Sequence, residues 1–244
     1  MAAPETNPLY QFTIERLIPL HIGPFDVSFT NSAAYMVAAV LIVTAFILLT
    51  TRQARLVPDR WQSVTELSYE FIANMIEENA GHGGERYFPF IFSLFMFILL
   101  GNLLGMIPYT FTYTSHIIIT FALAAIVFIG VTLIGIARHG LRFLTLFAPE
   151  GVPLWLMPIL VPIEVISYFI RPFTLSIRLF ANMVAGHTTL AIFAGFVVSL
   201  GIFGFLPLAV TVALVLLELL VAVLQAYVFT ILTCLYLHDA LHLH

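Results

Sequence analysis

The most informative segment of the chain, residues 170–183, reads IRPFTLSIRLFANM. It lies inside a long apolar region, yet it carries Arg171, Arg178 and Asn182. An arginine side chain stays charged under nearly all conditions. Holding that charge at the centre of a bilayer costs at least ~2.5–3.5 kcal/mol by insertion scales. A chain that keeps Arg178 in such a segment is expected to need a positive charge inside the membrane.

The composition around this segment indicates an integral membrane protein. Of the 244 residues, 61% are hydrophobic and 9% are charged, whereas about 25% are charged in a typical soluble domain. Backbone polar groups inside a bilayer must bond to one another, so the spans are helices or a closed barrel. The apolar runs are long and continuous, which favours helices over the alternating pattern of a barrel. We therefore predict an all-α polytopic membrane protein.

The same composition argues against several other classes of protein. The formal net charge of -4 is too small to indicate a nucleic-acid partner. Cys234 is the only cysteine, so no internal disulfide forms, and no spacing of histidines indicates metal ligation. We expect neither a metal nor a cofactor. The N-terminus has no basic stretch followed by an apolar run, so it is not typical of a cleaved signal peptide.

Apolar runs and basic flanks divide the first part of the chain into three segments. Residues 1–32 are expected to be extracytoplasmic, with a short interfacial helix within residues 9–20. Residues 33–60 hold the first span, over 33–49, and a flank that the positive-inside rule assigns to the cytoplasm because it contains Arg52, Arg55 and Arg60. Residues 61–84 form an amphipathic helix too polar to cross, which either packs against the bundle or a partner subunit or simply connects two spans.

The second part of the chain holds four more crossings. Residues 85–153 contain spans over about 88–107 and 117–136, and Arg138 and Arg142 mark a second cytoplasmic flank. Residues 154–244 contain apolar stretches over about 157–200 and 206–237, followed by a cytoplasmic tail. A helix over the first stretch would reach ~60 Å, about twice the hydrocarbon thickness. It must be strongly tilted or broken, with Pro162 and Pro172 as candidate kinks. We predict a tilted hairpin.

Polar residues of the hairpin gather on particular helix faces. At about 100° per residue, four side chains of the first helix fall within about 40° of one another, namely Glu164, Arg171, Arg178 and Asn182. Ser167 extends this face, and Glu218 and Gln225 share a face of the second helix. Ionisable residues inside a membrane favour an ion path or a proton relay. Glu164 lies toward the cytoplasm, and His187 and Glu218 lie toward the outside, which predicts two polar half-paths separated by Arg178.

Each of these residues also has a structural explanation. His187 and Glu218 could form a buried contact between helices, and Glu164 could reach the membrane interface. The two amide side chains are also typical of interhelical hydrogen bonds. Arg171 could anchor its helix near the headgroups. Arg178 could take part in a structural salt bridge, although no acidic residue lies one turn away in its own helix.

At these residues the chain resembles subunit a of the membrane sector of F-type ATP synthases. The resemblance covers most of the chain and rests on SIRLFANMVAGH (176–187), LQAYVF (224–229) and NLLGMIP (102–108). It implies that the partners are a rotating ring of small proteolipid (c-type) subunits, the peripheral stalk (b-type) subunits and the rest of the ATP synthase complex. We expect a bacterial inner membrane, and the basic flanks with five crossings predict an N-terminus outside and a C-terminus in the cytoplasm.

The resemblance further implies a role for each polar residue. Arg178 is implied to be essential for proton translocation, with Asn182 and Gln225 near it. The inlet side would use Glu218 and His187, and the outlet side would use Glu164 and Ser167, with Arg171 as a supporting charge. Many bacterial members carry an acidic residue where His187 stands and a histidine where Glu218 stands. This chain has the opposite arrangement, which resembles the mitochondrial type.

The resemblance therefore implies that the chain is the proton-conducting stator of a rotary ATP synthase. Its inlet and outlet half-channels would protonate and deprotonate the carboxylates of the ring. No stretch resembles a nucleotide-binding loop, so the chain is not expected to be a catalyst by itself. The alternative is a self-contained proton-coupled secondary transporter, which would show internal repeats that this sequence lacks. An intramembrane hydrolase would need a metal-binding helix or a nucleophile–base pair, and neither is apparent.

Overall fold

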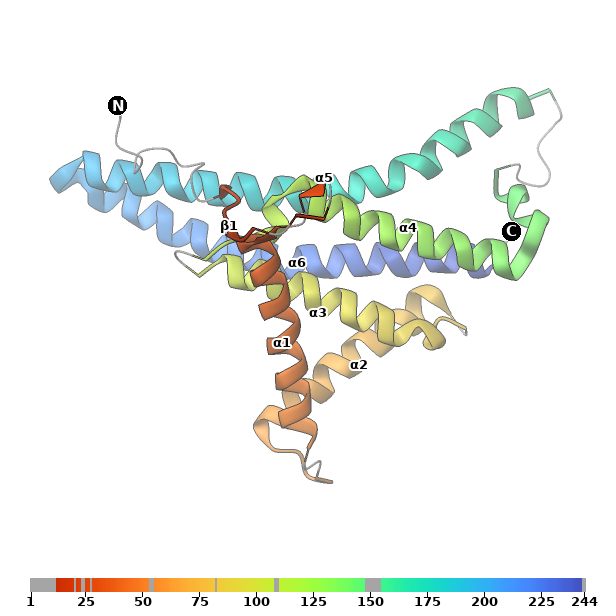
Figure 1. The fold of residues 1–244 in the computed structure, drawn as a ribbon, viewed down its shortest axis with the longest axis horizontal. Coiled ribbons are helices and arrows are strands. Elements are labelled where there is room, and N and C mark those ends of the chain that lie inside the picture. Colours follow the sequence, from red (N-terminus) through yellow and green to blue (C-terminus); the bar gives the residue numbers. More distant parts are fainter. Residues whose placement is uncertain are drawn as a thin grey trace. The chain divides into compact units, whose positions relative to one another are not determined.

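The computed structural model describes residues 12–19, 21–22, 25–26, 28–52, 55–81, 83–107, 110–147 and 155–242. All of its long elements are helices, which confirms the all-α fold class (Figure 1). In chain order the elements are β1 (Arg16–Ile18), β2 (His21–Ile22), β3 (Phe25–Asp26), β4 (Phe29–Thr30), α1 (Asn31–Thr51), α2 (Arg60–Ala80), η3 (Glu85–Tyr87), α3 (Phe88–Gly105), η4 (Tyr113–Ser115), α4 (Ile117–His139), η5 (Gly140–Phe147), α5 (Met157–Ser199), η6 (Gly201–Gly204) and α6 (Phe205–Leu241).

Five helical segments in the described part of the chain are long and apolar enough to cross a membrane. They are Asn31–Thr51, Glu85–Gly105, Ile117–His139, Met157–Ser199 and Gly201–Leu241. These segments match the five predicted crossings, with ends that differ by only a few residues. Helix α2, the predicted amphipathic helix, is not among them.

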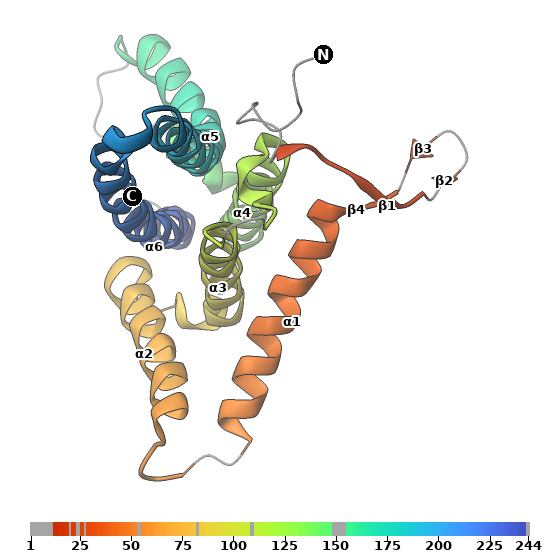
Figure 2. The same ribbon diagram turned by 90° about the vertical axis from the view of Figure 1, so that its left-hand side faces the viewer.

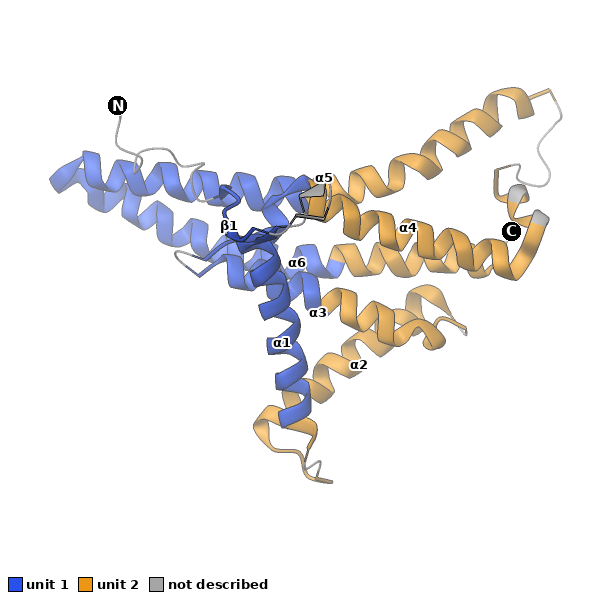
Figure 3. Ribbon diagram, viewed as in Figure 1, with its two compact units in different colours: residues 1–49, 96–117, 179–227 blue, residues 50–95, 118–178, 228–244 orange. Residues whose placement is uncertain are grey.

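The chain divides into two compact units (Figure 3). Unit 1 comprises residues 1–49, 96–117 and 179–227, and unit 2 comprises residues 50–95, 118–178 and 228–244. Helices α3, α5 and α6 each contribute a substantial part to both units. Among the residues with no exposed surface, Ile98, Ala222 and Ala226 lie in unit 1, and Ile72 and Phe229 lie in unit 2.

Helix α5 is a single unbroken helix of 43 residues that includes both Pro162 and Pro172. At ~1.5 Å per residue it is about 65 Å long. Of the two predicted alternatives, a tilted helix and a broken helix, the structure has the unbroken one. Such a helix must be strongly tilted to remain in a bilayer about 30 Å thick. The turn η6 then leads into α6, with Gly201 at φ 55° in the left-handed region that glycine adopts most easily. In unit 1 the last part of α5 and the first part of α6 lie side by side (Figures 1 and 2).

The N-terminal segment contains short strands where the sequence suggested a helix within residues 9–20. Strand β1 pairs with β4 in antiparallel fashion, with Arg16 opposite Thr30 and Ile18 opposite Phe29. Strand β2 pairs with β3 in the same sense. A residue that precedes proline is biased toward extended backbone, and Ile18 precedes Pro19, which accounts for the strand at this position. Residues 9–11 and 20 lie outside the described part of the chain.

Helix α2 buries polar as well as apolar residues in unit 2. Its second half buries Ile72 and Ile76, as expected of an amphipathic helix. Its first half instead buries Gln62 and Thr65, while Trp61 is 70% exposed. The buried polar groups are paired: Nε2 of Gln62 donates to Glu66 at 2.7 Å, and the hydroxyl of Thr65 lies 2.8 Å from that of Thr50. Exposed apolar side chains on the first half are suited to a lipid surface or to another subunit.

Candidate functional site

His187 of α5 and Glu218 of α6 form a buried pair in unit 1. Nε2 of His187 lies 3.6 Å from Oε1 of Glu218, and the two side chains are 12% and 6% exposed. Neither carboxylate oxygen receives a hydrogen bond from any described residue. A buried carboxylate without donors is costly as a bare anion. The pair is therefore suited to hold a proton and to pass it on, which is the chemistry expected of ionisable residues inside a membrane.

The close approach of Glu218 to α5 depends on Gly186. A Cβ atom at this position would lie 2.6 Å from Oε1 of Glu218 and 2.9 Å from its Cδ, which is too short for a non-bonded contact. Gly195, two turns or so farther along α5, would place a Cβ atom with nothing within 4 Å. The missing side chain at residue 186 therefore provides the space that the carboxyl group occupies.

Asn182 and Gln225 connect the same two helices at a neighbouring level of unit 1. Nδ2 of Asn182 donates a hydrogen bond to Oε1 of Gln225 at 2.7 Å. Gln225 is 3% exposed, and its Nε2 group has no hydrogen-bond partner among the described residues. A buried donor without a partner costs about 1–3 kcal/mol. This amide is therefore available to a buried water molecule.

A cavity of about 240 Å³ lies between α5 and α6 in unit 1 and reaches both of these pairs. Its lining includes Glu218, Asn182, Gly186 and Thr189. A water molecule takes up about 30 Å³ in the liquid, so the cavity has space for several of them. Water in this cavity would give Glu218 a hydrogen-bonded route toward Asn182.

The loop between α3 and α4 adds a polar group to His187 that the sequence did not reveal. Oγ1 of Thr112 lies 3.4 Å from Nε2 of His187, so this ring nitrogen lies near a hydroxyl as well as a carboxylate. Phe12 also meets the imidazole edge-on, with ring centroids 6.2 Å apart. The only sequence signal for Thr112 was its position in the polar turn after the second span.

Asn102 joins α3 to α6 in the interior of unit 1. It has no exposed surface, and its Nδ2 donates to the backbone carbonyl of Ala222 at 3.1 Å. This bond lies four residues from Glu218 along α6. It fixes the rotation of α6 about its own axis, because a shift of that helix would leave the buried amide without its acceptor.

Arg171 is paired within unit 2. Its Nη1 donates to Oδ2 of Asp239 at 2.9 Å. Its guanidinium carbon lies 5.5 Å from the ring centroid of Tyr168 and 5.0 Å from that of Tyr236, both within cation–π range. The hydroxyl of Tyr168 in turn lies 2.6 Å from that of Thr132. Sequence reasoning did not single out Asp239, although it is the one acidic residue after the last apolar stretch.

The other predicted residues of unit 2 make few polar contacts. Arg178 and Ser167 are exposed and Glu164 is half-buried. None of the three forms a hydrogen bond or an ion pair through its side chain with another described residue. The structure thus pairs His187 with Glu218, Asn182 with Gln225 and Arg171 with Asp239, and leaves Arg178 open. Among the described residues, no group of three or more metal-binding side chains converges.

Comparison with known proteins gives matches along nearly the whole chain. The family described as "ATP synthase A chain" matches residues 33–238. The chain is 59% identical over 244 residues to ATP synthase subunit a of Chelativorans sp., with 97% of this chain and 98% of the relative covered. It is 57% identical over 245 residues to subunit a of Paramagnetospirillum magneticum, with 98% and 99% covered. For subunit a of Pelagibacter ubique the identity is 54% over 241 residues, with 98% and 99% covered.

Proposed function

The chain belongs to the ATP synthase A chain family, and on that premise we propose that it is the proton-conducting stator of a rotary ATP synthase. Family membership makes it a multi-pass membrane subunit of a proton-driven ATP synthase, which works with the rest of that complex. It also argues against a self-contained secondary transporter. The finer proposal concerns how protons pass through this chain.

The observation that carries the proposal is the His187–Glu218 pair inside two membrane-crossing helices. A carboxyl group that has an imidazole at 3.6 Å, no hydrogen-bond donor among described residues and a cavity beside it can accept and release a proton without a large rearrangement. We assign this pair to the inlet half-channel, and Asn182 and Gln225 to a position near Arg178. Protons would enter from the side on which the N-terminus lies.

Arg178 acts as the fixed charge between the two half-channels in this proposal. A rotor carboxylate that faces lipid must be neutral, because a bare charge there is too costly. When the same carboxylate reaches Arg178, the guanidinium favours its ionised form, so the proton leaves. Two facts support this role: Arg178 is exposed, and its side chain has no ion-pair partner among the described residues. Its partner would come from a ring of small proteolipid (c-type) subunits, one carboxylate at a time.

The outlet half-channel would use Glu164 and Ser167, which lie nearer the start of α5 than Arg178 does. Arg171 lies between them and Arg178 in sequence, but Asp239 already neutralises it. A paired arginine competes poorly for the rotor carboxylate, so we assign Arg171 a supporting role. In this proposal the C-terminal tail would lie in the cytoplasm, and peripheral stalk (b-type) subunits would hold the stator against the torque of the ring.

Glu218→Gln in the assembled complex tests the inlet directly. The substitution keeps the shape of the side chain but removes its exchangeable proton. We expect ATP-driven proton uptake into membrane vesicles to fall by roughly tenfold or more, within the range for removing a positioned proton carrier. Glu78→Gln on α2 is the matched control, because Glu78 is exposed and lies outside the proposed path. Wild-type proton uptake by an assembled Glu218→Gln complex would show that the His187–Glu218 contact is only structural.

A further inference from the structure

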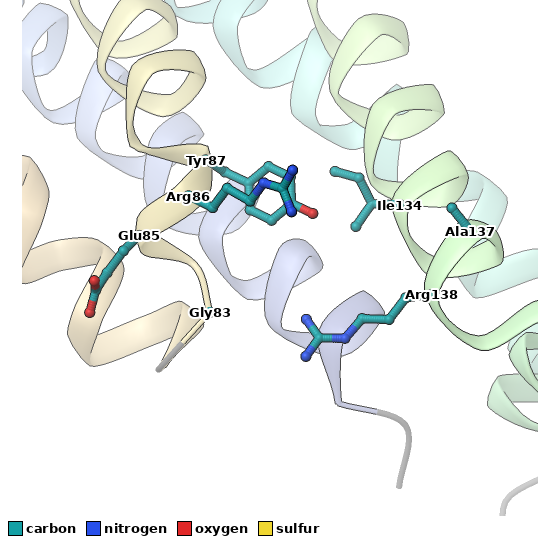
Figure 4. Close-up of a pocket in the computed structure, with 7 residues that line it drawn as sticks. All are labelled: Gly83, Glu85, Arg86, Tyr87, Ile134, Ala137 and Arg138. Carbon is teal, nitrogen blue, oxygen red and sulfur yellow. The ribbon is translucent and has the colours of Figure 1, made fainter.

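A second cavity lies in unit 2 between η3 and the end of α4, and none of its lining residues belongs to the proposed proton path (Figure 4). Its volume is about 880 Å³, within the size range of ligand-binding pockets. Two arginines from different helices contribute to its wall, together with one aromatic, two apolar residues and a glycine: Arg86, Arg138, Tyr87, Ile134, Ala137 and Gly83.

The two arginines extend into this cavity from opposite sides. Figure 4 shows the side chain of Arg86 directed toward α4, and that of Arg138 directed back toward the segment before α3. Nη1 of Arg138 comes within 3.7 Å of the place where a Cβ atom of Gly83 would lie, so it reaches across to that segment. Neither side chain forms an ion pair or a hydrogen bond with another described residue. Two guanidinium groups thus line one cavity without an ion pair to any described residue.

Glu85 also lines the cavity and is the obvious candidate to neutralise the arginines. Its carboxylate forms no ion pair with any described residue, and Figure 4 shows it directed away from Arg138. The three charged residues together leave one net positive charge. The cavity therefore still favours an anionic ligand.

The position of the cavity relative to the spans limits what that anion is. The span that contains α3 begins at Glu85, and the span of α4 ends at His139, so Arg86 and Arg138 lie at helix ends, at the level of lipid headgroups. Tyr87 is of the residue type enriched at this level. Ile134 lies one turn deeper along α4 and gives the cavity an apolar wall toward the hydrocarbon region. A ligand that is anionic at one end and apolar at the other matches this arrangement.

We infer that this cavity binds the headgroup phosphate of an anionic phospholipid. Arginine guanidinium groups bind phosphate oxygens in a bidentate manner, and basic pockets between membrane helices are suited to such headgroups. Arg86 and Arg138 bind the phosphate from two sides, and an acyl chain lies along Ile134. The bound lipid joins α3 to α4 in unit 2, independently of whether protons pass through α5 and α6.

The test uses the assembled complex in phosphatidylcholine vesicles that contain phosphatidylglycerol with a photoreactive acyl chain. We expect labelling of residues 83–87 and 134–138 to fall by roughly tenfold in Arg86→Gln and in Arg138→Gln, because each removes charge-assisted hydrogen bonds. Arg142→Gln is the matched control: Arg142 is exposed, follows α4 and does not line the cavity. Labelling in this control should equal that of the wild type.

Three other results would each overturn the inference. Unchanged labelling in both cavity variants would show that the arginines do not hold the lipid. Competition by inorganic phosphate as effective as that by unlabelled phosphatidylglycerol would identify a small-anion site instead. A complex in which these two segments are not labelled at all would mean that another subunit covers the cavity. Proton uptake by Arg86→Gln and Arg138→Gln, measured in parallel, separates this outcome from failure of the proton path.

Discussion

Glu218 can approach α5 closely because residue 186 is a glycine. We expect Gly186→Ala to displace its carboxyl group, because the added Cβ atom would lie 2.6 Å from Oε1. Overpacking of this kind costs about 1–3 kcal/mol, and the displaced group would no longer meet His187. ATP-driven proton uptake should fall by roughly tenfold while the complex still assembles.

The control for this prediction lies on the same helix. Gly195→Ala adds the same methyl group at a position with nothing within 4 Å, so its proton uptake should equal that of the wild type. Equal uptake by Gly186→Ala and Gly195→Ala would mean that the position of Glu218 against α5 does not matter for transport.

His116, just before α4, should make the stability of the chain depend on pH. Burial lowers the pKa of His116 below its ordinary value of 6.5, and its ring stacks on Phe111 with centroids 5.2 Å apart. A histidine whose pKa is lower in the folded protein stabilises the fold when the pH is above the ordinary pKa. This stability is lost as the pH falls through the pKa of the folded protein. We expect the melting temperature to fall between about pH 7 and about pH 5.

His116→Phe isolates this contribution, because phenylalanine retains an aromatic ring for the stack but does not titrate. The variant should lose less melting temperature than the wild type over the same pH interval. Identical pH dependence in the two proteins would contradict the assignment to His116 and point to other titrating groups.

Helices α5 and α6 are joined in unit 2 by the ion pair between Arg171 and Asp239. Their side chains are 27% and 40% exposed, so solvent screens the pair and its contribution should be about 1 kcal/mol. We expect Arg171→Gln and Asp239→Asn each to lower thermal stability by roughly that amount. The double variant should lose less than the sum of the two single losses, because each single change already breaks the same contact.

If the double variant lost as much thermal stability as the two single variants together, the two residues would not stabilise each other. The same variants also test whether Arg171 has a supporting role, in contrast to the role proposed for Arg178. Substitution of a supporting residue should reduce stability more than it reduces the coupling of proton flow to ATP synthesis. A complete loss of coupling in Arg171→Gln, with normal assembly, would instead give Arg171 a direct part in translocation.

The helices themselves could be predicted because apolar length and basic flanks depend on local sequence alone. The stretches 33–49 and 117–136 needed no knowledge of tertiary structure. The strands β1 to β4 could not be predicted in this way, since each has only two or three residues and depends on pairing with a distant partner. The unbroken course of α5 was also undecided, because the effect of Pro162 and Pro172 depends on what surrounds the freed backbone groups.

The candidate site was predicted only in part, for a related reason. Helical periodicity places Glu164 and Arg171 on one face of their own helix, but it does not give the rotation or the axial offset of a second helix. The contacts of Arg171 with Asp239 and of His187 with Thr112 depend on that offset. The unpaired state of Arg178 was easier to foresee, since its own helix offers no acidic residue one turn away.

Across the whole molecule, the charges fall into those paired within the chain and those that the proposed stator mechanism needs to be unpaired. Arg171 and His187 have acidic partners within the chain, whereas Arg178 has none among the described residues. A proton that crosses 100 mV releases about 2.3 kcal/mol, so several protons must be summed to drive one ATP. A single chain with fixed half-channels does not sum them, and we therefore expect a ring of proteolipid subunits to co-purify with it.

In the proposed mechanism, Arg178 separates the two half-channels and receives the rotor carboxylates. The most direct measurement compares ATP synthesis driven by a proton gradient in membrane vesicles from the wild type, Arg178→Ala and Arg178→Gln. We predict that both variants assemble, lose coupled ATP synthesis and leak protons passively, because the charge that blocks direct passage is gone. Arg142→Gln should remain fully coupled. Wild-type coupling in both Arg178→Ala and Arg178→Gln would show that Arg178 does not separate the half-channels.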